Sequence, residues 1–509
     1  MKFAIVGGGT AGWMTAATLI RQFPQADLTL YESDKVPPIG VGESTTQFFR
    51  VWLKFLGLKD EEWMAACDAT YKVSVMFHGF HDVDDSPWQY PFGIPRADTY
   101  TPDYWFYKQS QEGFPGSRLA EDYNLAAQCA IRNKLPVGEY ANEYYDLQKS
   151  AGFHFNASKF AIWLRDNYCL PKGVKHVIKD IKKKPKADLV FDCTGFASKF
   201  NKSKWISFED WLPNNSAWVT RVHYDDKDTQ IKPCTDCTAL SSGWVWNVPT
   251  YETIGTGYVF CDKFISPENA RKEFRKHLAK NVQSDAALYT DKMFRLIKFK
   301  TGRREEIWKG NVVSIGLSAG FIEPLESNGL LSVHNFAVFL ADALSMHEGK
   351  VNTLMRAQFN RRCRKHMSQF AHFVGNHFMM TTKDNSEYWR HISENINYMD
   401  DQAEDERGTH GGYPLDDFPL KMDEIAQFQF QQLAGNAFIC AGHMHTPATP
   451  WTCDYMEKRG NIDMSSFKVL NSGYQLDPNI HAEIDQFPTP EEFYYEDVAG
   501  IDFHHSLHG

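Results

Sequence analysis

Glycines at fixed spacing near the start of the chain are the first residues whose types could do chemistry. Gly7, Gly9 and Gly12 fill a Gly-x-Gly-x-x-Gly pattern, and Glu32 follows about 20 residues later. The first glycine permits a tight turn, the second lets backbone N–H groups approach a pyrophosphate, and the third permits close helix–strand packing. The acid can accept hydrogen bonds from ribose hydroxyls. The pattern predicts a dinucleotide site without distinguishing FAD from NAD.

The elements around these glycines fit such a site. Residues 3–6 and 27–31 read as strands, and residues 13–20 read as the helix between them. A helix start attracts anions, so Thr10 and Ala11 join the predicted binding residues. The less favoured alternative is a glycine-rich turn in a plain βαβ unit. No second Gly-x-Gly-x-x-Gly follows, which indicates that the chain has no nicotinamide domain of its own.

Further loops of small and polar residues follow predicted strands and resemble ligand-contact edges of α/β sheets. One loop is GVGEST at residues 40–45, ahead of a predicted helix at 47–56. Another closes the buried strand 188–191, and a third follows the strand 311–316 ahead of an apolar helix from 330 to about 347. The predicted cofactor contacts from these loops are Gly42, Glu43, Ser44, Thr45, Asp192, Gly195 and Gly316.

The remaining segments frame this core. Residues 67–80 alternate like a strand around Lys72, 81–115 read as a long loop, 116–170 are mostly helical, and 218–260 read as antiparallel strands. Two tryptophans at 244 and 246 would share one strand face, which normally means core. The last 160 or so residues are helical and rich in aromatics. A lysine cluster at 176–186 reads as a solvated turn.

Composition excludes several classes of protein. The chain has 509 residues, 43% of them hydrophobic, and a net charge of −10, which describes an ordinary globular protein rather than a disordered or fibrous one. An acidic surface disfavours nucleic acid, and no apolar run of about 18 residues predicts a membrane span. The ten cysteines are too sparse for a disulfide scaffold. A single CxxC at 234–237, expected on a surface loop, lacks the second ligand pair of a zinc site, so we predict no metal. The glycine pattern explains the apolar start of the chain better than a signal peptide does, so we predict a cytoplasmic protein.

With these pieces placed, residues 1–350 resemble the flavin-dependent halogenases, and specifically the tryptophan halogenase branch. GGGTAGW at residues 7–13 is shared with many flavoproteins. The more specific carriers of the resemblance are GVGEST at 40–45, ATYKVSVMF around Lys72, DCTGF at 192–196, GWVWNVP at 243–249 and GFIEPLESNG at 320–329.

The resemblance implies a division of labour. In that family reduced FAD activates dioxygen, a bound halide is oxidised to hypohalous acid, and this acid crosses the protein to a lysine beside an aromatic substrate. A separate NAD(P)H-dependent flavin reductase supplies the reduced FAD. Carried over, Lys72 is that lysine, Glu326 is the carboxylate near the substrate, and Ser327 orients these groups or relays protons. Backbone of Asn328 and Gly329 meets halide and flavin, and Trp244 and Trp246 wall the flavin from the substrate.

Residue chemistry agrees with these roles. An amine can carry an electrophilic halogen or hydrogen-bond its carrier, and a buried carboxylate can take a ring proton. Three departures leave the specificity open: Asn328 replaces a common Thr, Val248 a common Ile, and Tyr90 a common His. The substrate could be tryptophan or another indole, a phenol or an azole, and the halide chloride, bromide or iodide. A flavin monooxygenase that hydroxylates directly, or a flavin-binding protein without catalysis, are the alternatives, and the tryptophan wall argues against the first.

The expected fold class is α/β: a doubly wound, Rossmann-like FAD domain interleaved with an antiparallel β substrate layer and capped by C-terminal helices. The core would span 1–350, with FAD segments near 1–45, 185–200 and 308–345. The substrate layer would span about 65–115 and 205–300. Residues 351–509 would form the cap, and the oligomeric state stays open.

Overall fold

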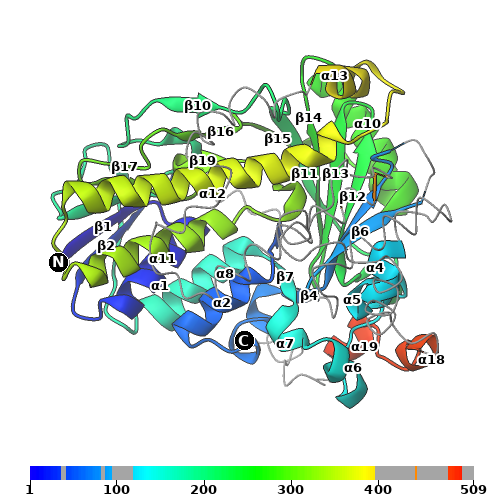
Figure 1. Cartoon of the computed structure of the whole chain (residues 1–509), viewed down its shortest axis with the longest axis horizontal. Helices are drawn as coiled ribbons and strands as arrows, with labels where there is room; N and C mark the ends of the chain where they lie inside the picture. The colour runs from blue at the N-terminus through cyan, green and yellow to red at the C-terminus, as the bar shows by residue number, and fades with distance from the viewer. Residues whose placement is uncertain are drawn as a thin grey trace, which may run out of the picture.

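The computed structural model describes residues 1–35, 42–81, 86–93, 118–395, 439, 442–443 and 480–495. It confirms the predicted fold class: a mainly parallel sheet and a larger, mainly antiparallel sheet lie beside each other, and helices cover them (Figure 1). Within these residues, no helix combines the length and apolar character that a bilayer crossing needs.

The dinucleotide-type domain is built on a six-stranded sheet in the order β17-β18-β9-β1-β2-β8. All neighbours are parallel except the β17–β18 pair. The central strand β1 is buried on both faces, as its unbroken apolar run predicts: Phe3 and Ile5 on one face are inaccessible to solvent, and Ala4 on the other is 2% exposed. The strands are β1 Lys2–Val6, β2 Asp27–Glu32, β8 Lys175–Ile178, β9 Leu189–Asp192, β17 Trp308–Lys309 and β18 Val312–Ser314.

The second layer is a seven-stranded sheet in the order β15-β11-β14-β13-β12-β5-β6. It is antiparallel apart from the parallel pairing of β5 with β12. Its strands are β5 Ser74–His78, β6 Trp88–Pro91, β11 Ser216–Val222, β12 Cys234–Leu240, β13 Gly243–Pro249, β14 Ile254–Phe260 and β15 Arg295–Lys298.

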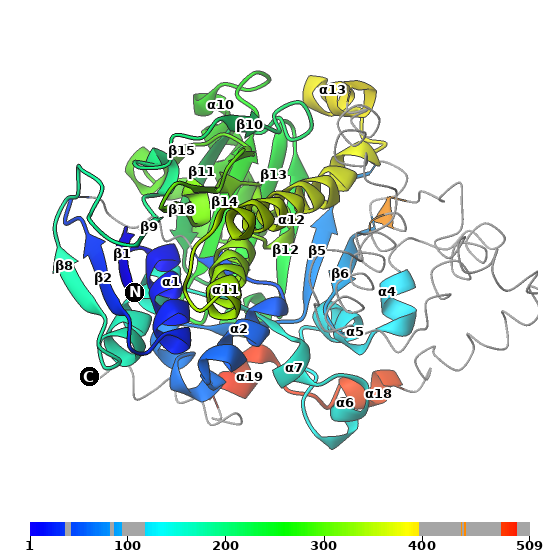
Figure 2. The same ribbon diagram turned by 60° about the vertical axis from the view of Figure 1, so that its left-hand side comes forward.

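Two expectations for this layer are wrong. The segment read as a long loop contains strand β6, which pairs with β5 at the sheet edge beside helices α4 and α5 (Figure 2). Its Trp and Tyr residues favour a strand, but the flanking prolines obscured the pattern. The CxxC cysteines Cys234 and Cys237 lie in β12 and are buried, not on a surface loop.

Two three-stranded sheets join the layers. In one, β3 Glu43–Ser44 and β4 Thr70–Lys72 both pair with β7 Gly152–Phe155, whose His154 is the register partner of Ser44 and of Thr70. This ribbon brings the GVGEST loop and Lys72 to one place. In the other, β10 Trp205–Ser207 and β19 Gly320–Phe321 flank β16 Gly302–Arg304.

Helices cover both sheets. Helix α1 Thr10–Gln22 packs against α11 Leu331–Met346, and the 27-residue α12 Thr353–Met379 runs from the six-stranded sheet to the seven-stranded one (Figure 1). The other α-helices in the described ranges are α2 Phe48–Leu56, α4 Arg118–Tyr123, α5 Leu125–Ile131, α6 Glu139–Tyr144, α7 Leu147–Ser150, α8 Ala157–Trp163, α9 Lys227–Gln230, α10 Pro267–Asn281, α13 Glu387–Asn395, α18 Ile480–Ile484 and α19 Pro490–Tyr495.

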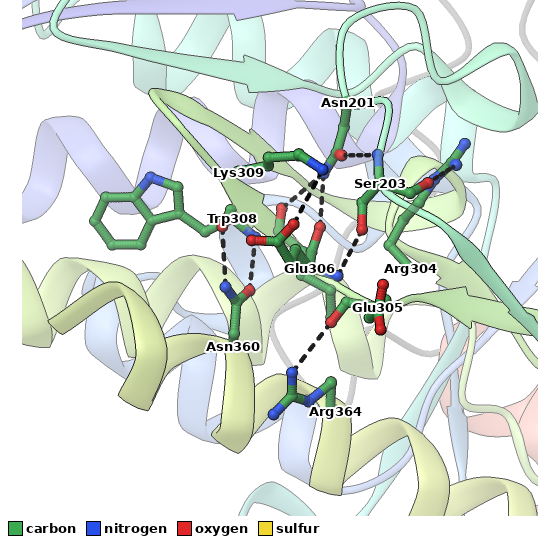
Figure 3. Close-up of polar contacts among 10 residues, drawn as sticks. Asn201, Ser203, Arg304, Glu305, Glu306, Trp308, Lys309, Asn360 and Arg364 are labelled. Carbon is green, nitrogen blue, oxygen red and sulfur yellow. Dashed lines mark hydrogen bonds and ion pairs between the residues drawn. The ribbon is translucent and has the colours of Figure 1, made fainter. Parts of the chain in front are cut away.

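A polar network fastens the first half of α12 to the dinucleotide-type domain (Figure 3). The Asn360 carboxamide receives the Trp308 backbone N–H at 2.7 Å and donates to the Trp308 carbonyl at 2.9 Å. Arg364 donates to the Glu305 carbonyl at 3.3 Å. Because a helix is stiff and rises about 1.5 Å per residue, this anchor fixes where side chains roughly 25 Å further along it arrive. One of them is His377.

Candidate active site

The glycine loop at the end of β1 forms a tight cradle. A Cβ atom on Gly7, whose φ is +121°, would lie 2.2 Å from the Cys193 carbonyl oxygen, and one on Gly12 would lie 1.8 Å from the Gly7 carbonyl oxygen. At Gly9 a Cβ would meet nothing within 4 Å, so the backbone there faces open space. Gly9 is the N-cap residue of α1 and has no side chain to bond the first turn. The backbone N–H groups at the start of the helix therefore stay available to an anion.

Glu32 lies at the end of β2, beside this cradle. A Cβ on Gly8 would lie 2.2 Å from the Glu32 carboxyl carbon, and Glu32 Oε2 is 2.8 Å from His176 Nε2 on β8. The glycine cradle, the uncapped helix start and this acid fit the pyrophosphate and ribose of FAD. His176 was missed because it opens the lysine cluster read as a solvated turn.

The loops after β9 and β18, which contain the predicted contacts Asp192, Gly195 and Gly316, pack against the glycine cradle. Gly316, with φ +70°, lies so close to helix α1 that a Cβ there would be 2.9 Å from the Ala11 Cβ. Gly195 also has a left-handed φ of +66°. Asp192 is wholly buried, and both of its oxygens accept bonds from its own loop, at Thr194 and at the backbone N–H groups of residues 200 and 201. Asp192 therefore shapes this loop, and its contact with the cofactor stays a prediction.

The GVGEST segment, described from Gly42 onward, lies against the EPLESNG segment. A Cβ on Gly329 would lie 2.4 Å from Glu43 Oε1, and burial raises the pKa of Glu43 to about 7. Ser44 Oγ lies 3.0 Å from Ser327 Oγ. Thr45 instead accepts the Phe153 backbone N–H at 2.9 Å and holds β7 in place.

Lys72 is fully buried at the end of β4. Its Nζ donates to Ser327 Oγ at 2.5 Å and lies 4.7 Å from the centre of the Phe92 ring. Burial lowers the pKa of Lys72 to about 7, and the nearby Glu326 carboxyl opposes that shift. An ammonium group in such a place is poised to lose its proton near neutral pH. The structure thus brings Lys72 and Ser327 together across 255 positions of sequence.

Glu326 ends a short 3-10 turn, Pro324–Glu326, and is 2% exposed. Burial raises its pKa to about 8, although Lys72 acts in the opposite direction. Its Oε1 lies 2.7 Å from His377 Nε2. Ser327 follows with a left-handed φ of +58°, a reversal that turns its hydroxyl toward Lys72. The Asn328 side chain donates back to the Ile322 carbonyl at 3.4 Å.

A cavity of about 70 Å³ opens beside Glu326. Half of its lining residues are aromatic, and two carry amide groups; the lining consists of Thr46, Gln47, Phe48, Tyr90, Phe92, Glu326, Leu331, Asn335, Phe370 and Phe373. A larger, open groove of about 590 Å³ borders the loops after β9 and β18 but contains neither Lys72 nor Glu326. The smaller cavity is therefore the candidate active site.

The two tryptophans of β13 share one face, as their spacing predicts, with ring centres 6.0 Å apart. Trp244 is fully buried, and its Nε1 donates to Glu323 Oε2 at 2.7 Å. Trp246 packs on Gly257, where a Cβ would lie 2.2 Å from the indole ring. Glu323 Oε2 also accepts a hydrogen bond from the Asn214 side chain at 2.8 Å.

Sequence reasoning missed His377 and the two phenylalanines of α12. Phe370, Phe373 and His377 are spaced three and four residues apart, so they form one stripe of the helix. The two phenylalanines line the cavity, and His377 contacts Glu326. The sequence pattern is enough to predict that stripe. It does not predict what the stripe faces, because that depends on how α12 is anchored at Asn360.

The parallel sheet with its glycine cradle is typical of a dinucleotide-binding protein, and comparison with known proteins makes the class specific. The profile of the tryptophan halogenase family matches residues 2–407. Tryptophan 6-halogenase SttH of Streptomyces toxytricini is 32% identical over 436 residues, which are 76% of this chain and 80% of that protein. Tryptophan 7-halogenase RebH of Lentzea aerocolonigenes is 31% identical over 435 residues, or 76% and 78% of the two chains.

Solved structures agree. The apo structure of VirX1 superposes with a TM-score of 0.80 at 29% identity, and the SttH crystal structure with 0.77 at 26%; each comparison covers 97% of this chain and 99% of the other. This chain belongs to the tryptophan halogenase family, a family of flavin-dependent halogenases. The resemblance seen in the sequence is thereby confirmed.

Proposed function

We propose that this protein halogenates an electron-rich aromatic ring, using hypohalous acid held at Lys72. The observation that carries the proposal is the buried cluster of Lys72, Ser327 and Glu326 beside an aromatic-lined cavity. Buried ionisable groups with shifted pKa values mark places where proton transfer is useful near neutral pH. A lysine buried there only for packing would lose the hydration of its ammonium group without a compensating gain in stability.

Reduced FAD, once bound, supplies the activated oxygen that oxidises the halide. The residues proposed to hold its pyrophosphate and ribose are those of the glycine cradle and Glu32, and Gly42, Ser44 and Gly329 would meet its flavin end. We place the halide at the backbone of Asn328 and Gly329. We further propose that a separate NAD(P)H-dependent reductase delivers the reduced FAD, as the single dinucleotide fingerprint suggests.

Lys72 would hydrogen-bond the hypohalous acid and donate a proton to its oxygen as the halogen moves to the substrate. Its lowered pKa suits this task, because the ammonium is close to balance with the amine at neutral pH. Ser327 holds the Nζ in place. Trp244 and Trp246 would separate the flavin from the substrate and so disfavour direct oxygen transfer.

The substrate we favour is a flat indole-type ring, because Tyr90, Phe92, Phe370 and Phe373 line the cavity and aromatic pairs stack or meet edge-on. The relatives SttH and RebH are named for tryptophan. Chloride or bromide is proposed as the halide. Gln47 and Asn335 offer amide groups that can orient polar parts of the substrate.

The test incubates the purified protein with FAD, a flavin reductase, NADH, oxygen and either chloride or bromide. Tryptophan, indole and a phenol serve as substrates, and mass spectrometry reads the products. We expect halogenated product that is lost in Lys72→Ala and kept in Lys159→Ala, a control lysine that pairs with Asp68 at 2.6 Å. Hydroxylated product without halide dependence would identify a monooxygenase instead. Halogenation that survives Lys72→Ala would refute the role of Lys72.

A further inference from the structure

His377 is a buried histidine in the active site that the proposed chemistry has not used. It lies near the end of α12, is 0% exposed, and places Nε2 2.7 Å from Glu326 Oε1. Its other nitrogen, Nδ1, has no hydrogen-bond partner among the described residues. A histidine kept only for structure normally satisfies both nitrogens when buried.

Aromatic rings fix the orientation of this imidazole. It stacks on Trp88 with an interplanar angle of 14° and a centroid distance of 5.5 Å, and lies 4.7 Å from Phe77. Phe80 and Phe373 meet it edge-on. A ring held between other rings cannot easily turn away, so Nε2 stays aimed at the carboxyl group.

The titratable groups around the pair come from several elements. Glu326 faces His377 directly, and the ring of His443 lies 6.4 Å from it, centre to centre. Lys72, Tyr90 and Cys237 each interact electrostatically with Glu326. Desolvation raises the pKa of Glu326 to about 8 and lowers that of His377 to about 3. At neutral pH the carboxyl therefore holds the proton and the imidazole is neutral.

This state poses a problem for the carboxyl as a base. A protonated carboxyl cannot accept a ring proton unless it gives up its own. The 2.7 Å contact supplies the outlet, because Oε1–H can donate to an unprotonated Nε2. Glu326 also lines the cavity, so its second oxygen can meet the substrate.

We propose that Glu326 relays the proton of the substrate ring and that His377 is its acceptor. The C–H bond at the halogenated carbon breaks, and its electron pair restores the aromatic ring. That proton binds Glu326 Oε2 while the proton on Oε1 moves to His377 Nε2. Glu326 is neutral before and after the step, and His377 becomes an imidazolium.

The remaining atoms balance. The halogen comes from the hypohalous acid, whose hydroxide takes a proton from Lys72 and leaves as water. The imidazolium then returns its Nε2 proton to Glu326 Oε1 as Oε2 releases the ring proton into the cavity, and Lys72 regains a proton. This inference rests on the proposed function, because it assigns a second residue to the same halogenation step.

The decisive experiment compares substrate carrying hydrogen or deuterium on the reacting carbon in single-turnover halogenation. In His377→Gln the amide can still donate to Glu326 but cannot accept a proton. We expect the halogenation step to slow by about 10²-fold or more and to acquire a primary isotope effect absent from the wild type. His366→Gln, a matched change at another buried histidine of α12, should retain the wild-type rate and isotope behaviour.

A slow His377→Gln without an isotope effect, or an unchanged rate, would overturn the relay. If this variant does not fold, His377→Ala provides the second test through rescue. Added imidazole should restore the rate, and pyrrole, which has a similar shape but no basic nitrogen, should not; equal rescue by both would also overturn the relay. Absence of halogenated product from the wild type would instead reject the proposed function itself.

Discussion

Replacing Lys72 with methionine should stabilise the folded protein at neutral pH while removing halogenation. The lysine is fully buried, and its pKa is lowered from 10.5 to about 7. A difference of one pKa unit corresponds to about 1.4 kcal/mol, so holding the ammonium in this place costs about 5 kcal/mol at pH values below 7. Methionine fills a similar volume without charge.

The net gain is smaller than that cost, because the substitution also leaves the Ser327 hydroxyl without its donor. An unmade buried hydrogen bond costs about 1–3 kcal/mol, which leaves a net stabilisation of roughly 2–4 kcal/mol near pH 6. In a chain of 509 residues each kcal/mol moves the thermal midpoint by about 1 °C. The midpoint should therefore rise by about 2–4 °C, while halogenation falls by about 10²-fold or more.

The gain should depend on pH with a definite sign. Between pH 7 and 10.5 the unfolded chain holds a proton on Lys72 that the folded wild type has lost, so wild-type stability rises with pH in that window. The advantage of Lys72→Met should shrink over the same window. Thermal midpoints of both proteins at pH 6.5, 8 and 9.5 measure this directly.

Lys159→Met changes a partly exposed lysine that pairs with Asp68, and it should alter stability by less than about 1 kcal/mol. If Lys72→Met lowers the midpoint at pH 6.5, or if its advantage does not fall by pH 9.5, then Lys72 does not carry a strained buried charge and the reasoning fails.

Three further predictions concern the cofactor, the halide and the tryptophan wall. Gly9→Ala should fold normally yet weaken FAD binding at least about tenfold by titration, whereas Gly12→Ala should unfold at lower temperature because its Cβ has no room. Glu43 lies against Gly329, where we place the halide, and its raised pKa of about 7 makes it anionic above that pH. Because this negative charge would repel the halide, the apparent KM for halide should rise with pH, and Glu43→Gln should flatten the rise. Trp244→Phe should lower the free energy of unfolding by about 1–3 kcal/mol, measured in urea, because Glu323 loses a buried donor.

The sequence predicted those parts of the molecule whose constraints are local. Much of the glycine cradle depends on backbone conformation and on contacts within about 30 residues, such as Gly12 with Gly7 and Gly8 with Glu32, so the pattern identifies strand, turn and helix together. The close approach of Gly7 to Cys193 joins distant parts of the chain, and the pattern does not predict it. Lys72, Glu326 and Ser327 were recognised from residue strings that resemble a family. Their meeting in space depends on β3 and β4 sharing β7, which no periodicity predicts.

Contacts made across the whole chain could not be predicted. His377 lies 51 positions from Glu326, and Asn360, which anchors its helix, lies 52 positions from Trp308. The predicted helical character of this region was correct for α12. Which face would meet the active site was set by side-chain hydrogen bonds to a distant strand, and a helical pattern contains no information about them.

A chain of hydrogen bonds links the GVGEST segment, where we expect the flavin to bind, to Lys72. His154 Nε2 is 2.8 Å from Thr235 Oγ1, which is 2.9 Å from Ser44 Oγ. Ser44 Oγ is in turn 3.0 Å from Ser327 Oγ, which accepts a hydrogen bond from Lys72 Nζ. Burial and the neighbouring Lys72 both lower the pKa of His154, so it stays neutral in this chain of hydrogen bonds. Because Ser44 belongs to the GVGEST segment, any shift of that segment on flavin binding would change the partner of Lys72. On the proposed placement of the flavin, these hydroxyl groups would couple the lysine to the cofactor, while Trp244 and Trp246 would keep flavin and substrate apart.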